Sequence, residues 1–286
     1  MVRTVNDLYL ETRRSLRNAR IEGAELEAKL LLCHALHCTK EQLLARMQMY
    51  TGEAVQKELL AFTRRRLQGE PVAYITGMWE FCGLDMEVSP AVLIPRSDTE
   101  VLVEEAFKLL RSQRKNDARI IDLGCGSGCI GIALGHFFPG SRITLVDVSP
   151  EAVEITKRNI ARNGMTRRCA VLEGNILESP PMRMGEYDLL VSNPPYIASA
   201  EIDRLDASVR DYEPRLALDG GEDGLAFYRS ILSRWLSVLS DSGCVIMEIG
   251  EGQAEAVMEL MHQAGLQSVR SAKDNYGTER IVLGTK

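Results

Sequence analysis

The tetrapeptide Asn193-Pro194-Pro195-Tyr196 combines residue types that can hold a planar amino group. A proline restricts the residue before it to extended conformations, so Asn193 and Pro194 are both conformationally restricted. The Asn193 amide oxygen and the Pro194 carbonyl can each accept a hydrogen bond from one NH2 group, while the Tyr196 ring offers that group a flat face. The pattern therefore predicts a site for a carboxamide or an exocyclic amine.

A second motif that could do chemistry is the glycine-rich run Gly124-Cys125-Gly126-Ser127-Gly128, which follows Asp122. Glycines let the backbone approach a ligand closely, and Asp147, at the end of the next apolar run, can accept hydrogen bonds from ribose hydroxyls. Residues 126–131 also fit the dinucleotide-binding pattern, so a nicotinamide-dependent dehydrogenase is an alternative. Asp122, however, would repel a pyrophosphate and attract a positively charged amino-acid group. S-adenosylmethionine carries such a group and is the cofactor that the residues favour.

Both motifs follow apolar runs that are typical of buried strands. From about residue 90 the chain alternates strand-like and helix-like segments, which predicts a parallel, doubly wound sheet with ligands at the carboxyl ends of its strands. Two late strands, Gln267–Ala272 and Arg280–Leu283, are too close for a crossover helix, so we expect them to pair antiparallel. The predicted fold class is thus α/β, with a mostly parallel seven-stranded sheet. The other predicted strands are Arg119–Leu123, Ile143–Asp147, Cys169–Leu172, Tyr187–Val191 and Cys244–Ile249, and the predicted helices include Cys129–Phe138, one that begins at Pro150, Leu225–Leu239 and Gln253–Ala264.

The beginning of the chain has a different pattern and predicts a small N-terminal helical domain over residues 1–70. Thr39 and Gln42 have the spacing of a capping box at a helix start. The β-rich stretch Val72–Val88, interrupted by glycines, predicts a hairpin connector over residues 71–92, and residues 93–286 would form the α/β domain. The predicted helices of the first domain are Val5–Ala19, Ala24–Leu36, one that begins at Thr39, and Glu53–Leu67.

Composition and charge argue against several classes of protein. Hydrophobic residues make up 45% of the chain and charged residues 26%, as is usual for globular proteins. A net charge of −6 argues against a protein that coats DNA, and no apolar run is long enough to predict a membrane span. The 7 cysteines form an odd set without CxxC spacing, and the N-terminus lacks an apolar signal segment. We therefore expect reduced thiols and a cytoplasmic protein.

Two further clusters favour structural roles. Cys33, His34, His37 and Cys38 lie too close together for the usual zinc patterns, so no metal site is expected. The run Arg64-Arg65-Arg66 suits the end of a helix, where basic side chains favour the helix dipole and form a solvated face.

Together these motifs resemble the class I S-adenosylmethionine-dependent methyltransferases. The narrower resemblance is to the HemK/PrmC family of N5-glutamine methyltransferases, which act on peptide chain release factors. It spans nearly the whole chain. Besides the motifs above and the helical front domain, it rests on PVAYITG at residues 71–77 with Glu80-Phe81, on LIPRSDTE at residues 93–100, and on YEPRLAL at residues 212–218.

The resemblance implies a Rossmann-like methyltransferase fold, a release factor as protein substrate, and a front domain that binds this partner. No membrane and no stable nucleic-acid binding are expected, while contact with the ribosome stays open. Residues 124–128 would surround the methionine part of S-adenosylmethionine, Asp147 would hold its ribose, and Asn175 and Ile176 would lie beside its adenine. Asn193 and the Pro194 carbonyl would bind the glutamine amide of the release factor's Gly-Gly-Gln motif, with Pro195 and Tyr196 shaping the slot.

Two positions depart from the family pattern. Asn175 stands where an acidic residue is common, which makes the adenine contact less secure, and Ser97 stands where proline is usual. An adenine-N6 DNA or RNA methyltransferase would use the same amino-group slot, but the sequence shows no target-recognition region. A noncatalytic adaptor would bind no cofactor. No candidate general base emerges, because His136 and His262 lie on predicted helices away from the strand ends.

Overall fold

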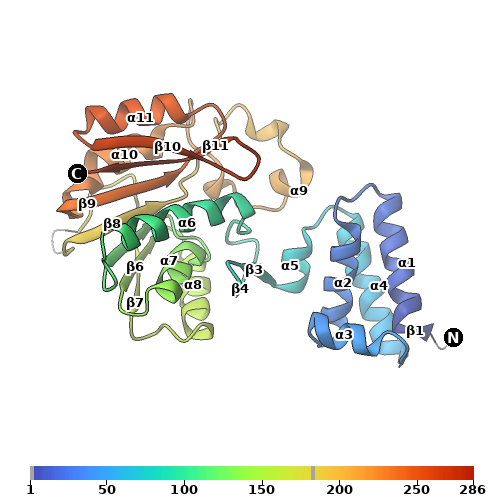
Figure 1. Ribbon diagram of the computed structural model, residues 1–286. Helices are drawn as coiled ribbons and strands as arrows, with labels where there is room; N and C mark the ends of the chain where they lie inside the picture. Colours follow the sequence, from blue (N-terminus) through green and yellow to red (C-terminus); the bar gives the residue numbers. More distant parts are fainter. Residues whose placement is uncertain (1–2, 182–183) are drawn as a thin grey trace. The chain divides into compact units, whose positions relative to one another are not determined.

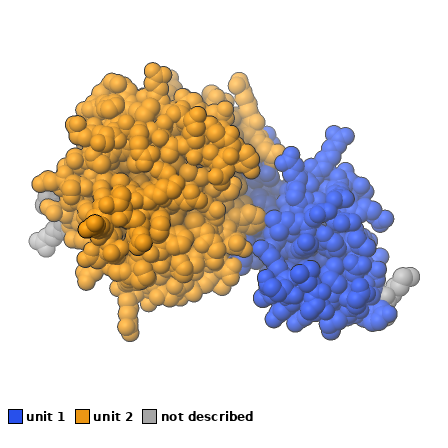
Figure 2. Space-filling model, in the orientation of Figure 1, with its two compact units in different colours: residues 1–78, 207–212 blue, residues 79–206, 213–286 orange. Residues whose placement is uncertain are grey.

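The computed structural model describes residues 3–181 and 184–286 and divides into two compact units (Figures 1 and 2). The first unit comprises Met1–Met78 with Ala207–Tyr212, and the second comprises Trp79–Asp206 with Glu213–Lys286. The border after Met78 falls inside the stretch that was predicted to be a connector. Within the described residues, no helix has both the length and the apolar character that crossing a bilayer requires.

The first unit is helical, as predicted. The capping box forms as expected, because the Thr39 side chain accepts from the Gln42 N–H and the Gln42 side chain accepts from the Thr39 N–H. His34 packs against the ring of Phe62, with the ring centroids 4.9 Å apart. The elements of this unit are β1 (Arg3–Thr4), α1 (Val5–Asn18), α2 (Ala24–Ala35), α3 (Lys40–Arg46), β2 (Tyr50–Thr51), α4 (Glu53–Leu67), α5 (Val72–Thr76) and α9 (Ala207–Arg210).

The predicted hairpin over Val72–Val88 is wrong in its first third. Residues 72–76 form the helix α5, and only β3 (Met78–Phe81) and β4 (Leu84–Glu87) make a two-stranded sheet. Four consecutive apolar residues, all buried, begin α5. Such a short apolar run fits a buried strand as well as a buried helix, and its periodicity does not distinguish them.

The second unit contains the predicted sheet, with the order β10-β11-β9-β8-β5-β6-β7. Neighbours from β9 to β7 pair in parallel, whereas β11 pairs antiparallel with both β9 and β10. The seven-stranded, mostly parallel fold and the antiparallel final pair are therefore confirmed. The strands are β5 (Arg119–Leu123), β6 (Arg142–Asp147), β7 (Cys169–Glu173), β8 (Tyr187–Ser192), β9 (Leu239–Glu248), β10 (Gln267–Lys273) and β11 (Glu279–Thr285).

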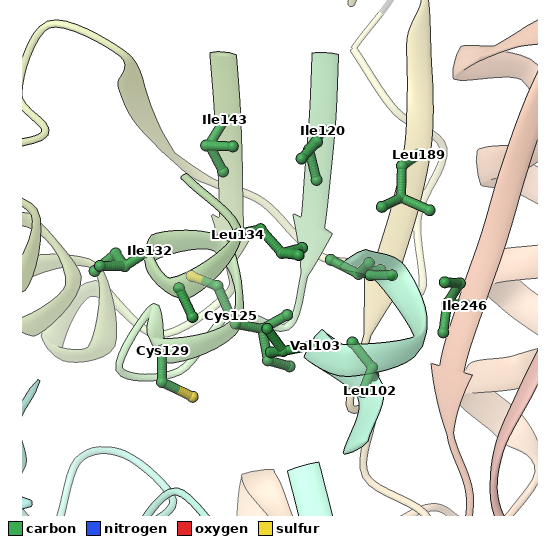
Figure 3. Close-up of a cluster of buried hydrophobic side chains, with 14 of the residues drawn as sticks. Leu102, Val103, Ile120, Cys125, Cys129, Ile132, Leu134, Ile143, Leu189 and Ile246 are labelled. Carbon is green, nitrogen blue, oxygen red and sulfur yellow. The ribbon is translucent and has the colours of Figure 1, made fainter. Parts of the chain in front are cut away.

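Two apolar clusters cover the two faces of this sheet. One cluster joins the sheet to α6, α7 and α8 and includes Leu102, Leu134 and Ile246 (Figure 3), and the other joins it to α10 and α11. The predicted helix Leu225–Leu239 is shorter than expected, because a 3-10 turn, η3 (Trp235–Val238), follows α10 and β9 begins at Leu239. The helices are α6 (Ser97–Ser112), α7 (Cys129–Phe137), α8 (Pro150–Arg162), α10 (Ala226–Arg234) and α11 (Ala254–Gln263), with short 3-10 turns η1 (Ile202–Arg204) and η2 (Arg215–Ala217).

The direction of the sheet's strand order reverses at β5. The chain runs outward from β5 through β6 and β7 on one side, and through β8 and β9 on the other. In open α/β sheets a ligand binds at such a switch point, beyond the carboxyl ends of the strands. Leu123 of β5 is in register with both Val146 of β6 and Ser192 of β8, so three neighbouring strands end at the same level.

Candidate active site

A cavity of about 510 Å³ lies at this switch point. Its size is within the range of small-molecule sites. The predicted site residues that line it are Gly124, Cys125, Gly126, Ser127, Asp147, Asn175, Ile176, Asn193 and Pro195. Of the remaining predicted residues, Asp122, Gly128 and Pro194 are buried outside the described lining, and Tyr196 borders a second cavity.

The glycine loop is held by hydrogen bonds to the middle of α8 and to the end of β6. The Thr156 hydroxyl donates to the Gly126 carbonyl at 2.7 Å, and the Gly126 N–H donates to Asp147 at 2.8 Å. A Cβ at Gly128 would lie 2.8 Å from the Thr156 methyl, closer than atoms can pack. Gly128 therefore brings the loop close to α8, whereas the loop residues before it face the cavity.

Asp147 ends β6 with its carboxylate at the edge of the cavity. Oδ1 accepts from the Ser149 N–H at 2.9 Å and Oδ2 from the Gly126 N–H at 2.8 Å. Burial raises the pKa of Asp147, an effect that these backbone donors counteract. Each carboxylate oxygen retains acceptor capacity, so two neighbouring hydroxyls, such as those of a ribose, can still donate to it.

Asp122 lies in the protein interior, at 0% exposure. Oδ2 accepts from the Gly131 N–H at 2.9 Å, whereas Oδ1 has no hydrogen-bond partner within residues 3–181 and 184–286. Burial raises the pKa of Asp122 to about 7. Unpaired buried acceptors are rare, and a positively charged ligand group at the neighbouring glycine loop would stabilise the carboxylate. Its contact with a cofactor stays a prediction.

Part of the cavity wall is apolar. Val148, Leu177 and Leu216 line it with 41%, 43% and 56% of their area exposed, which is high for large apolar side chains. A flat aromatic ring would cover this surface. With the Asp147 carboxylate and the unpaired oxygen of Asp122, these residues fit a group that carries a base, a ribose and a positive charge.

The loop after β7 forms part of this wall. The Ile176 carbonyl accepts from the Ser230 hydroxyl at 2.7 Å and from the Trp235 ring N–H at 3.1 Å, which anchors the loop to α10 and η3. The Asn175 side-chain oxygen accepts from the Leu177 N–H at 2.9 Å, so it is hydrogen-bonded within its own loop. Direct contact between Asn175 and adenine stays a prediction.

The tetrapeptide follows β8 directly and separates two cavities. Asn193 and Pro195 line the cavity at the glycine loop, while Tyr196 lines a second one of about 550 Å³. Gln253 supports the tetrapeptide from behind, because its Nε2 donates to the Tyr196 carbonyl at 2.9 Å. The backbone of Gly224 also packs there, and a Cβ on it would lie 2.4 Å from that same carbonyl oxygen.

Two buried polar residues behind the tetrapeptide, Thr99 and Glu248, were given no role in the sequence prediction, although Thr99 lies in the LIPRSDTE motif. The Asn193 Nδ2 donates to the Thr99 hydroxyl at 3.1 Å, and Thr99 donates to Glu248 at 2.6 Å. The Tyr196 hydroxyl donates to the other oxygen of Glu248 at 3.4 Å. Burial raises the pKa of Glu248 to about 7. For Glu248, the available signal was a single carboxylate near the end of the apolar run at residues 244–249.

A second buried carboxylate, Glu213, holds the YEPRLAL motif in place next to the cavity. Glu213 is 5% exposed, pairs with Arg96 and accepts from the Ile94 N–H at 3.3 Å. These contacts hold the motif beside the LIPRSDTE segment. Leu216 and its neighbours in the motif consequently line the cavity.

Comparison with known proteins relates the whole chain to one family. The family model described as the PrmC N-terminal domain matches residues 7–77, and the methyltransferase small domain matches residues 99–211. The release factor glutamine methyltransferase of Geobacter sulfurreducens is 41% identical over 98% of this chain and 96% of its own length.

Two solved structures are also similar to this chain. A release-factor-specific protein-(glutamine-N5) methyltransferase from Alicyclobacillus acidocaldarius is 32% identical, with coverage of 70% of this chain and 99% of that one and a TM-score of 0.41. A methyltransferase from Pyrococcus furiosus, 20% identical, has the same fold, with a TM-score of 0.52 over 78% of this chain and 96% of that one.

Proposed function

Because this chain belongs to the release factor glutamine methyltransferase family, we propose that the cavity at β5, β6 and β8 binds S-adenosylmethionine and that Asn193 holds the substrate glutamine beside it. The reaction transfers a methyl group to the side-chain amide nitrogen, N5, of a glutamine in a peptide chain release factor, within the Gly-Gly-Gln motif. The observation that carries the site assignment is the position of Asn193, which lines the cavity at the point where β8 ends beside the glycine loop.

The lining of the cavity supports a set of cofactor-binding residues. Asp147 would accept hydrogen bonds from the ribose hydroxyls, and Val148, Leu177 and Leu216 would cover the adenine. The glycine loop would hold the methionine part, whose ammonium would stabilise the buried carboxylate of Asp122. When bound, the cofactor would supply an electrophilic sulfonium methyl. The new N–C bond would replace the S–C bond, whose electron pair would stay on sulfur as a neutral thioether, and the amide nitrogen would release one proton to solvent.

An amide nitrogen is a poor nucleophile because its lone pair is delocalised into the carbonyl. Positioning must therefore supply much of the rate, and holding two reactants in line contributes up to about 7–11 kcal/mol in favourable cases. The Asn193 oxygen and the Pro194 carbonyl would accept the two N–H bonds of the substrate amide and so orient its nitrogen. Pro195 and the Tyr196 ring would form the sides of the slot. No histidine lines either cavity as described, so nothing assigns a histidine base.

The first unit is proposed to bind the release factor, since it corresponds to a separate family domain, the PrmC N-terminal domain. A cytoplasmic site of action fits its cysteines, which are free thiols.

The test is to incubate the protein with isotopically labelled S-adenosylmethionine and a release factor, and to locate the label by mass spectrometry of peptides. One methyl group on the Gly-Gly-Gln glutamine is expected, and a release factor with that glutamine replaced by alanine is the matched control. Equal labelling of the control, or labelling of nucleic acid instead of protein, would contradict the proposal.

A further inference from the structure

A chain of three polar side chains leads from the protein interior to the active-site cavity. Glu248 is the last residue of β9, Thr99 lies in the first turn of α6, and Asn193 follows β8. Glu248 and Thr99 are both 2% exposed. Thr99 and Asn193 line the cavity, whereas Glu248 contacts it only through them. The Thr99 hydroxyl therefore links the buried carboxylate of Glu248 by hydrogen bonds to the proposed substrate-binding amide of Asn193.

The ionised carboxylate of Glu248 fixes which group donates and which accepts in these hydrogen bonds. An ionised carboxylate only accepts, so Thr99 must donate its single hydroxyl hydrogen to Glu248. The Thr99 oxygen can then only accept from Asn193, which turns the Asn193 NH2 group toward Thr99. The Asn193 oxygen is consequently left for the cavity. This is the polarity needed to accept a hydrogen bond from a substrate NH2 group.

The opposite polarity would be unproductive. If position 248 carried a donor, the Thr99 hydrogen could turn to the Asn193 oxygen and the amide would rotate by about half a turn. Asn193 would then present its own NH2 group to the substrate NH2 group, two donors facing each other.

We propose that Glu248 is a positioning residue for methyl transfer, because its carboxylate, acting through Thr99, orients the Asn193 amide with its oxygen toward the methyl acceptor. This inference rests on the proposed function of the site. It assigns to Glu248 no contact with substrate or cofactor, and Thr99 is the link between the two.

The surroundings of Glu248 make its charge sensitive to pH near neutrality. Burial raises its pKa to about 7 and Asp98 on α6 adds to the rise, whereas the hydrogen bond from Thr99 lowers it. The Tyr196 hydroxyl and Arg280 on β11 also lower it. The Tyr228 hydroxyl of α10 donates to its main-chain carbonyl at 2.9 Å. The oriented state of Asn193 should therefore be populated at higher pH and lost as Glu248 takes up a proton.

Three variants test this in the full-length protein with a release factor and S-adenosylmethionine. Glu248→Gln and Thr99→Val should each lower kcat roughly tenfold to a hundredfold, as is typical when a partner that orients a site residue is lost, with little change in cofactor affinity measured by calorimetry. Thr99→Ser keeps the hydroxyl and should restore most of the rate. Thr144→Val is the matched control, because it removes a threonine hydroxyl that accepts from Tyr187, away from the tetrapeptide. It should retain the wild-type kcat.

The pH profile separates orientation from simple damage to the fold. Wild-type kcat should rise with pH through about 7, and this rise should disappear in Glu248→Gln and in Thr99→Val. The double variant should be no worse than either single one, since the residues act as a unit. Wild-type kcat and pH profile in either variant would overturn the inference. If Glu248→Gln does not fold, the comparison of Thr99→Val with Thr99→Ser decides. Absence of methyl transfer by the wild type would instead refute the proposed function.

Discussion

Replacing Asn193 by alanine should separate methyl transfer from cofactor binding. The substitution removes the amide oxygen that would accept from the substrate, while the Asp147 carboxylate and the apolar wall are left in place. Loss of one preorganised hydrogen-bonding group from an active site typically lowers kcat by about 10²–10³-fold, or roughly 2.7–4 kcal/mol. We expect a loss of that size, because Asn193 would contribute one of the two acceptors for the substrate amide.

The fold should tolerate this change. The bond from Asn193 to Thr99 is a single neutral hydrogen bond at 3.1 Å, and Thr99 keeps its stronger bond to Glu248 at 2.6 Å. The free energy of unfolding should fall by only about 0.5–1.5 kcal/mol, which chemical denaturation can measure.

The assay pairs two measurements on each variant. Methyl transfer to a release factor at saturating S-adenosylmethionine gives kcat, and calorimetry with the cofactor product gives the cofactor affinity. Asp147→Ala is the contrasting variant: it should weaken cofactor binding, because each charge-assisted hydrogen bond to the ribose contributes roughly 1.5–3 kcal/mol. If Asn193→Ala lost cofactor affinity and transfer to the same extent, the role assigned to Asn193 would be wrong.

Three further predictions concern the framework of the site. Gly224→Ala should lower both stability and kcat, because Gly224 has φ +73° and the added Cβ would lie 2.4 Å from the Tyr196 carbonyl oxygen. Gly252→Ala is its control: at φ +79° and with open space around it, this change should lower the free energy of unfolding only by the backbone strain, about 1–3 kcal/mol. Ser97→Pro should raise the free energy of unfolding by about 0.4–1 kcal/mol, because Ser97 is the first residue of α6, where proline is well tolerated. Arg96, at φ −102° and ψ 152°, already has the extended conformation that a following proline requires. An unchanged or lower denaturation midpoint would contradict this prediction. Glu248 holds its proton up to about pH 7 in the folded protein but only to about 4.5 when unfolded, so the free energy of unfolding falls as pH rises from about 4.5 to about 7 and is level above that. Glu248→Gln should therefore be more stable than wild type at pH 8, by roughly 1–3 kcal/mol, and this advantage should vanish below pH 4.5 in denaturation series at both pH values.

Local sequence patterns were sufficient for the sheet and for the loops at its carboxyl edge. An apolar run followed by a glycine turn or by Asn-Pro specifies a buried strand and its end, and parallel strands bring their ends together. Gly124, Asp147 and Asn193 consequently line one cavity, while their roles there stay predictions. The same kind of pattern failed at residues 72–76, where the helix was missed because an apolar run that short does not show whether its period is that of a helix or a strand.

The support behind Asn193 could not be predicted in the same way, because it depends on which strand lies beside which. Thr99 and Glu248 are 149 positions apart in the chain, and their contact exists only because β9 lies next to β8 and α6 packs across β9. From the sequence alone, a carboxylate at the end of an apolar run is equally suited to a solvated strand end. Once the strand order is known, the parallel register of Ser192 with Met247 places the following residues, Asn193 and Glu248, side by side. The orientation of the proposed substrate-binding amide is thus a property of the assembled sheet, whereas the identity of that amide is a property of the local motif.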